Sequence, residues 1–176
     1  RIEIDKGTDD TYILDIESTD PANFQLLGAA NYDHGSTSQL SDNNNALGLI
    51  KGSARIKNNV DIPVLSTATN YNISESARLW VDGGYVAKNQ GNAIVPYGKI
   101  RVSDGNLEAE ISSGITTRGN GLIRVEGGTL STNQIRTSVY GADNVGGYVQ
   151  SGGTTHILGE NTSNNYYCFN LTYPGN

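Results

Sequence analysis

Apolar and polar residues alternate along four short segments in the second half of the chain, and each segment runs into a turn that contains glycine. These segments are residues 79–84, 100–105, 123–128 and 148–153. Because successive side chains of a strand point to opposite faces, the alternation predicts half-buried strands. The last glycines of the segments are 21, 23 and 25 residues apart. A period of this size is typical of a solenoid.

Each repeat predicts one coil made of short strands. A second apolar position recurs after the turn at Val86, Leu107 and Leu130, but the fourth unit has Thr155 there and Gln150 in place of a valine. No segment carries the i, i+3, i+4, i+7 spacing of an amphipathic helix. We therefore expect an all-β fold, a parallel β-helix solenoid with coils of about 21–25 residues, in which equivalent strands of neighbouring coils pair.

The phrase Val-x-Gly-Gly, at residues 81–84 and 125–128, is the part of the repeat that points to a known architecture. Together with the period and the alternation, it resembles the right-handed parallel β-helix of autotransporter passengers, large bacterial surface adhesins and pectate-lyase-like enzymes. The resemblance covers roughly residues 55–176. It implies a fold rather than an activity, because this architecture serves both enzymes and inert stalks. The right hand is taken from the resemblance and from the general crossover preference.

The first part of the chain repeats less regularly. Residues 2–5 and 12–17 look like strands, and the stretch from 19 to 45 is mostly polar. We expect a single domain over 1–176, in which residues 1–54 form irregular N-terminal coils or a cap with long loops and 55–176 form regular coils. A separate small β domain at the N-terminus is the alternative.

Extending the period outward gives two further expectations. A step of 21 residues back from Val81 reaches Val60 and predicts a degenerate coil there. A step of about 25 residues forward from Gly153 passes Asn176, and the sequence starts at Arg1 and contains no methionine. We therefore expect a segment of a longer protein whose flanking coils contact this one.

Composition excludes several classes of partner. The net charge is −6 and the pI is near 4.8, and the 12 Lys and Arg residues form no run, so nucleic acid is not an expected partner. No apolar stretch approaches 18 residues, so we expect no membrane span. One cysteine, Cys168, and the two distant histidines, His34 and His156, predict neither a disulfide nor a metal site, and no cofactor is expected.

The outward positions of the repeated strands are the first candidate site. Stacking places equivalent residues about 4.8 Å apart, so Trp80 should lie beside Arg101, and Arg101 beside Arg124. Asp82 and Glu126 should lie diagonal to Arg101 and offset the repulsion between the arginines. One interpretation is a sugar-binding strip with an exposed Trp80 as its platform. The other is a polar face whose side chains satisfy one another and keep the solenoid soluble.

Acidic residues suggest two other kinds of chemistry. Asp9, Asp10, Asp15, Glu17 and Asp20 lie close in sequence and could hold Ca²⁺, but the pattern favours a solvated strand face and turn. For glycoside hydrolysis, Asp82 and Glu126 are two coils apart with Ser103 between them. This gives about 9.6 Å by the strand spacing, at the edge of the range for an inverting mechanism. His156 should lie opposite Ser131 and Glu108, but no triad is apparent.

These observations favour a structural or adhesive segment of an extracellular or cell-surface protein, with carbohydrate, such as a polysaccharide or host-surface glycan, as the candidate ligand of the outward ladder. The alternative is part of a β-helical polysaccharide lyase or glycoside hydrolase. A segment of a phage tail fibre is a third class, which would require trimers.

Overall fold

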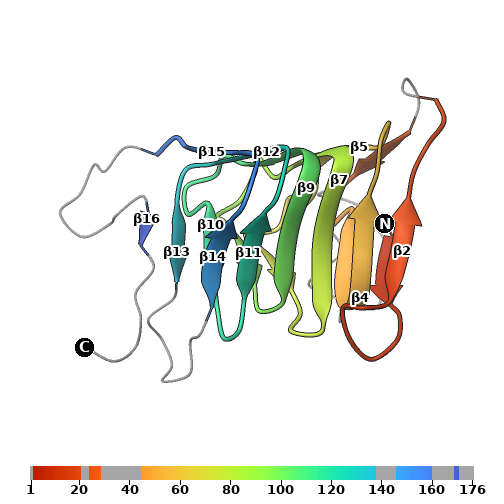
Figure 1. Cartoon of the computed structure of the whole chain (residues 1–176), viewed down its shortest axis with the longest axis horizontal. Coiled ribbons are helices and arrows are strands. Elements are labelled where there is room, and N and C mark those ends of the chain that lie inside the picture. The colour runs from red at the N-terminus through yellow and green to blue at the C-terminus, as the bar shows by residue number, and fades with distance from the viewer. Residues whose placement is uncertain (1, 21–23, 29–44, 138–145, 160–168, 171–176) are drawn as a thin grey trace.

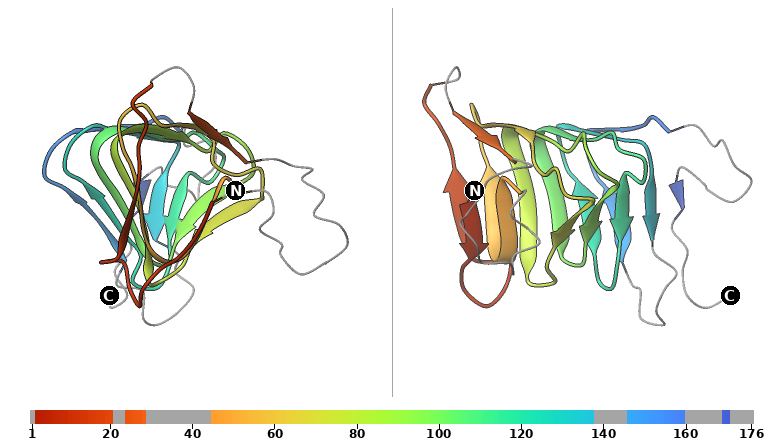
Figure 2. Two further views of the ribbon diagram at one scale, coloured as in Figure 1. Left: turned by 90° about the vertical axis from the view of Figure 1, so that its right-hand side faces the viewer. Right: turned by 180° about the vertical axis from the view of Figure 1, so that it is seen from behind.

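A computed structural model describes residues 2–20, 24–28, 45–137, 146–159 and 169–170. All regular structure in these ranges is β-strand, and all pairings between the named strands are parallel. The strands stack along one axis as a solenoid that makes about four turns (Figure 1). Seen along this axis, the coils enclose a three-sided cross-section (Figure 2).

The three sides are called face 1, face 2 and face 3. Face 1 contains β1 (Ile2–Asp5), the first half of β4 (Leu47–Ile56), β6 (Asn70–Ile73), β8 (Ala93–Pro96), β10 (Ile115–Thr117), β13 (Ile135–Thr137) and β16 (Phe169–Asn170). Face 2 contains β2 (Ile13–Ile16), the second half of β4, the first parts of β7 (Ala77–Ala87) and β9 (Lys99–Ala109), β11 (Leu122–Val125) and β14 (Gly147–Gln150). Face 3 contains β3 (Gln25–Leu27), β5 (Asp61–Val64), the ends of β7 and β9, β12 (Thr129–Thr132) and β15 (Thr154–Ile157).

The register of face 2 confirms the repeat that the sequence predicts. Leu79 pairs with Ile100, Ile100 with Ile123, and Ile123 with Tyr148. On face 3, Val86, Leu107, Leu130 and Thr155 form a column in the same way. The fold is therefore the expected parallel β-solenoid, and each repeat is one coil.

The core is a set of inward columns that run the length of the solenoid. In the strands of the middle coils alternate residues are buried, and each packs on the equivalent residues of the coils before and after it. The columns of faces 2 and 3 contain Leu79, Ile100, Ile123, Val81, Val102, Val125, Val86, Leu107 and Leu130, all with no exposed surface. Burial of one such side chain stabilises the fold by about 1.5–3 kcal/mol.

A coil precedes β7 as expected, but the predicted register, in which Val60 aligns with Val81, is wrong. Val81 pairs with Ile56, and the residues after Val60 pair instead with Tyr85 and Val86. The step between these coils is therefore 25 residues on face 2 and 24 residues on face 3. The glycine turn of the later repeats is replaced here by Asn59, which has a positive φ of 64°. Asparagine tolerates this left-handed conformation, so the turn exists without the glycines that mark it in the sequence.

One lysine is buried inside a corner of the coils. Lys88 has no exposed surface, and its Nζ donates hydrogen bonds to the backbone oxygens of Gln90 and Ala68 at 2.5 and 2.9 Å. A third backbone oxygen, of Ser66, lies at 3.5 Å. Burial lowers the pKa of Lys88 to about 8, because removing the ammonium from water disfavours its charged form.

Candidate functional site

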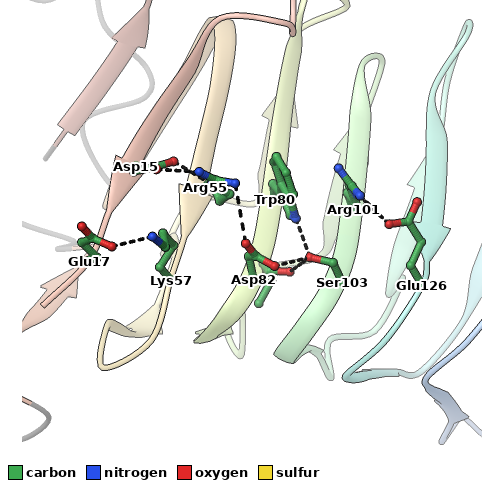
Figure 3. Close-up of polar contacts among 10 residues, drawn as sticks. Asp15, Glu17, Arg55, Lys57, Trp80, Asp82, Arg101, Ser103 and Glu126 are labelled. Atoms are coloured by element: carbon green, nitrogen blue, oxygen red, sulfur yellow. Dashed lines mark hydrogen bonds and ion pairs between the residues drawn. The ribbon is translucent and has the colours of Figure 1, made fainter.

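The outer side of face 2 brings the predicted ladder together. Trp80 on β7 pairs with Arg101 on β9, and Arg101 pairs with Arg124 on β11, as the sequence predicts. The same column begins with Asp15 on β2 and Arg55 on β4 (Figure 3). We call this column, together with the next outward positions Glu17, Lys57, Asp82, Ser103 and Glu126, the face 2 ladder.

Trp80 is enclosed by arginines. The guanidinium carbon of Arg55 lies 4.7 Å from the centre of the Trp80 ring system, and that of Arg101 lies 4.1 Å from it. Arg78 adds a third guanidinium at 5.6 Å. Trp80 is only 9% exposed, so the expectation of an exposed tryptophan platform is wrong. The physical reason is the one-coil spacing of about 4.8 Å, which brings each neighbouring arginine within cation–π range.

The indole nitrogen of Trp80 also makes a hydrogen bond. Trp80 Nε1 donates to Ser103 Oγ at 2.6 Å, and Ser103 Oγ donates to Asp82 Oδ1 at 2.5 Å. The other oxygen of Asp82 lies 3.9 Å from Arg55 Nη1. Asp82 therefore faces Ser103 and Arg55, rather than Arg101 as the sequence suggested, and the indole and the carboxylate share one hydroxyl group.

Each end of the ladder carries its own ion pair. Arg55 binds Asp15 through two hydrogen bonds, of 2.7 and 2.6 Å, and this interaction lowers the pKa of Asp15 and raises that of Arg55. At the other end, Arg101 donates two hydrogen bonds to Glu126 Oε2, at 2.9 and 2.6 Å. Arg124 Nη1 lies 3.6 Å from the second oxygen of Glu126. Glu126 thus offsets the repulsion between the two arginines, as predicted.

A second row of charges on face 2 was not predicted. Ser53, Arg78 and Lys99 are register partners on β4, β7 and β9, and Asp10 of the β1–β2 loop contacts all three. The Asp10 carboxylate lies 2.8 Å from Arg78 Nη2 and 2.9 Å from Lys99 Nζ. Its backbone oxygen accepts hydrogen bonds from Ser53 Oγ at 2.5 Å and from Arg78 Nη2 at 2.6 Å.

Sequence reasoning could have found half of this second row. Arg78 and Lys99 each lie two positions before a ladder residue, so alternation places them on the outer side of face 2. The loop that carries Asp10 gives no such indication, because its path across the coils depends on the tertiary structure. Asp10 is 12% exposed at its side chain, and this loop ties three successive coils together.

The acidic side chains near the N-terminus bind different partners and do not converge on one point. Asp9 accepts hydrogen bonds from the backbone nitrogen and hydroxyl of Thr11, and these bonds lower the pKa of Asp9. Asp10 and Asp15 bind the basic residues named above, and Glu17 lies 2.6 Å from Lys57. Within the described ranges, no three His, Cys, Asp or Glu side chains form a group that could hold a metal ion. His34 and Cys168 lie outside those ranges.

Face 3 aligns three residues that invite comparison with a catalytic triad. Ser131 pairs with Glu108 on one side and with His156 on the other, as the sequence predicts. The order places the serine between the acid and the histidine, whereas a triad needs the histidine in the middle to accept the serine proton. Glu108 instead accepts a hydrogen bond of 2.6 Å from Tyr85, and burial with this bond raises the pKa of Tyr85.

Comparison with protein-family models, with curated proteins and with solved structures finds no match for this chain. In the part of the chain that the structure describes, no helix is long and apolar enough to cross a membrane.

Proposed function

We propose that this chain is a structural segment of an extracellular or cell-surface protein, a stiff shaft whose face 2 ladder clamps neighbouring coils together. The observation that carries the proposal is the position of Trp80 between Arg55 and Arg101, which belong to the coils before and after it. Contacts of this kind resist shear between coils. The extracellular location and the right hand of the helix rest on the resemblance of the repeat to autotransporter, adhesin and pectate-lyase-like β-helices.

The clamp interpretation accounts for the charges better than a sugar site does. A sugar platform needs an open aromatic face, whereas here two guanidinium groups occupy both sides of the indole. Asp82 and Glu126, which an inverting glycosidase would need free to act on water and the leaving group, bind Ser103 and Arg101. Carbohydrate binding by this ladder would require these contacts to open.

Trp80→Ala tests the proposal through two separate measurements. Binding of the intact chain to an array of polysaccharides is measured first, and chemical unfolding of the wild type and the variant is measured second. The clamp predicts that the variant loses about 3–5 kcal/mol of stability, as for other deletions of a buried tryptophan side chain. It also predicts that the wild type retains no glycan. Glycan binding that disappears in a variant of unchanged stability would establish the ladder as a sugar site instead.

The location needs its own experiment. Antibodies against the purified chain, applied to intact cells of the source organism, should label the cell surface or detect the protein in the medium. Labelling only after the cells are permeabilised would refute the extracellular location. It would not affect the proposed role of the ladder, because that role depends only on contacts between coils.

A further inference from the structure

The inward columns of faces 2 and 3 become polar together at one coil. On face 2 the column of Val81, Val102 and Val125 continues into Gln150. The neighbouring column of Leu79, Ile100 and Ile123 continues into Tyr148. On face 3 the column of Val86, Leu107 and Leu130 continues into Thr155. Three neighbouring positions in register with the core columns thus change from aliphatic to hydrogen-bonding side chains in the coil formed by β13, β14 and β15, where Gln150 is exposed and Tyr148 and Thr155 are partly buried.

These three side chains form one hydrogen-bonded cluster. Tyr148 Oη lies 2.6 Å from Gln150 Oε1 and 2.6 Å from Thr155 Oγ1. Gln150 Nε2 donates to the backbone oxygen of Gly153 at 3.1 Å. Polar groups at the end of a core cost little when they are bonded to one another or to water. The cluster therefore gives the core a surface that water can wet.

The opposite end of the solenoid lacks this substitution. There the same two columns of face 2 begin with Leu14 and Ile16 on β2, which pair with Ala54 and Ile56. Ile16 is buried and Leu14 is partly buried against the core. On face 1 the apolar column runs on from Ile135 to Phe169, whose ring packs edge-on against Tyr148 with centroids 5.5 Å apart. The polar change thus belongs to faces 2 and 3 at one end only.

We propose that the polar side chains on β14 and β15 form a cap, which opposes the stacking of a second copy of this chain on these two strands. No described strand pairs with the outer edges of β14 and β15. Open parallel edges invite pairing with another chain. A second copy that stacked there would bury Gln150 and the tyrosine hydroxyl away from water and would find no aliphatic column to continue. The cap therefore blocks end-to-end association of copies of this chain.

Restoring the apolar columns tests this proposal. The triple variant Tyr148→Leu, Gln150→Val and Thr155→Leu gives this coil the side-chain types of the coils before it. Sedimentation velocity and amide hydrogen exchange are measured across a wide range of protein concentration. We expect the triple variant to form larger species, with β14 and β15 gaining protection as concentration rises. In the wild type, exchange of the same amides should not depend on concentration.

A matched variant controls for added surface hydrophobicity. Thr154→Val with His156→Leu adds apolar atoms to the outer side of β15 and should leave both measurements unchanged. Circular dichroism establishes that each variant is folded. If the triple variant does not fold, Gln150→Val alone makes the same test with one change.

Two results would decide against the proposal. Concentration-dependent protection of β14 and β15 in the wild type would overturn it, and so would a folded apolar variant that does not associate. Thr155→Val keeps the shape of the threonine but removes its hydrogen bond to Tyr148. The backbone N–H groups of Gly147 and Ser151 donate to the backbone oxygens of Gly121 and Val125. We expect Thr155→Val to speed amide hydrogen exchange at Gly147 and Ser151 by about fivefold.

Discussion

Asp10 and Lys99 are 89 residues apart in the chain, yet the Asp10 carboxylate accepts a hydrogen bond of 3.0 Å from Lys99 Nζ. The contact joins the β1–β2 loop to β9 and passes over β4 and β7. Among the ion pairs of face 2 in the described ranges it spans the most residues, and Arg78 shares the same carboxylate. A single acidic side chain thus links the first coil to the regular part of the solenoid.

Removing this charge should destabilise the fold. In Asp10→Asn the amide keeps its size, but Arg78, whose side chain is 16% exposed, loses its compensating charge. We expect a loss of about 2–3 kcal/mol in the free energy of unfolding, somewhat less than for a fully buried pair. Urea denaturation measures it. Asp5→Asn is the control, because the pair of Asp5 and Lys51 is 3.8 Å long and half exposed and should contribute less than about 1 kcal/mol. Equal effects of the two substitutions would contradict the linking role of Asp10.

Ser103→Ala should weaken the ladder without opening a cavity. The substitution leaves the indole N–H of Trp80 and one oxygen of Asp82 without their shared partner. An unsatisfied buried donor costs about 1–3 kcal/mol, so we expect a loss of this size in thermal or urea unfolding. Ser151→Ala, at the exposed turn after β14, should change stability by no more than about 0.5 kcal/mol. If Ser103→Ala were as mild as Ser151→Ala, the hydrogen bonds of Ser103 would not contribute to the clamp.

The lowered pKa of Lys88 predicts that the free energy of unfolding rises in alkaline solution. The folded pKa of Lys88, about 8, is below the ordinary value of 10.5, so between these values the unfolded chain binds more protons than the folded one. Stability therefore increases with pH in this window, by about 2 kcal/mol between pH 8 and 10. Above pH 10, Tyr85 acts in the opposite sense, because its pKa is raised in the folded state and its stabilisation is lost as it ionises.

Urea denaturation at a series of pH values, for the wild type and Lys88→Met, isolates this contribution. The rise between pH 8 and 10 should be absent from Lys88→Met. Lys51→Met, which alters an exposed lysine, should keep the rise. A wild-type stability that stays flat or falls across the window would mean that the three backbone oxygens hold the proton on Lys88 against the effect of burial.

Two glycine substitutions separate backbone strain from the closeness of stacked coils. Gly105 has φ +76°, and a Cβ there would lie 2.2 Å from the backbone oxygen of Gly84 in the preceding coil. Gly119 has φ +55°, but the nearest atom to a Cβ, on Tyr97, is 4.0 Å away. We expect Gly119→Ala to cost about 1–2 kcal/mol from the left-handed conformation alone. Gly105→Ala should cost clearly more, because two backbones must separate. Similar melting temperatures of the two variants would contradict this explanation of the turn glycines.

The sequence alone determined the coil and most of its register. Leu79, Ile100 and Ile123 fall in one column because strand alternation has a period of two and the turns that follow recur at a nearly fixed spacing. These properties are local, so they can be recognised without knowing the fold. The same logic correctly placed Trp80 beside Arg101 and Arg101 beside Arg124.

The sequence predictions failed where a turn had no glycine. Asn59 takes the left-handed conformation that glycines take in later coils, so counting back by a fixed period reached Val60 instead of Ile56. A repeat that is found by its glycines cannot reveal a coil whose turn uses a different residue. Only the pairing of β4 with β7 fixed the register there.

The tertiary structure alone decided what the ladder residues do. Trp80 could have been an open platform or a covered side chain, and the sequence is the same in both cases. The choice depends on the positions of the Arg55 and Arg101 guanidinium groups across neighbouring coils, and on Asp10, which reaches Arg78 from a loop. Long side chains and loops are not constrained by strand alternation, so their contacts follow from packing in three dimensions rather than from local pattern.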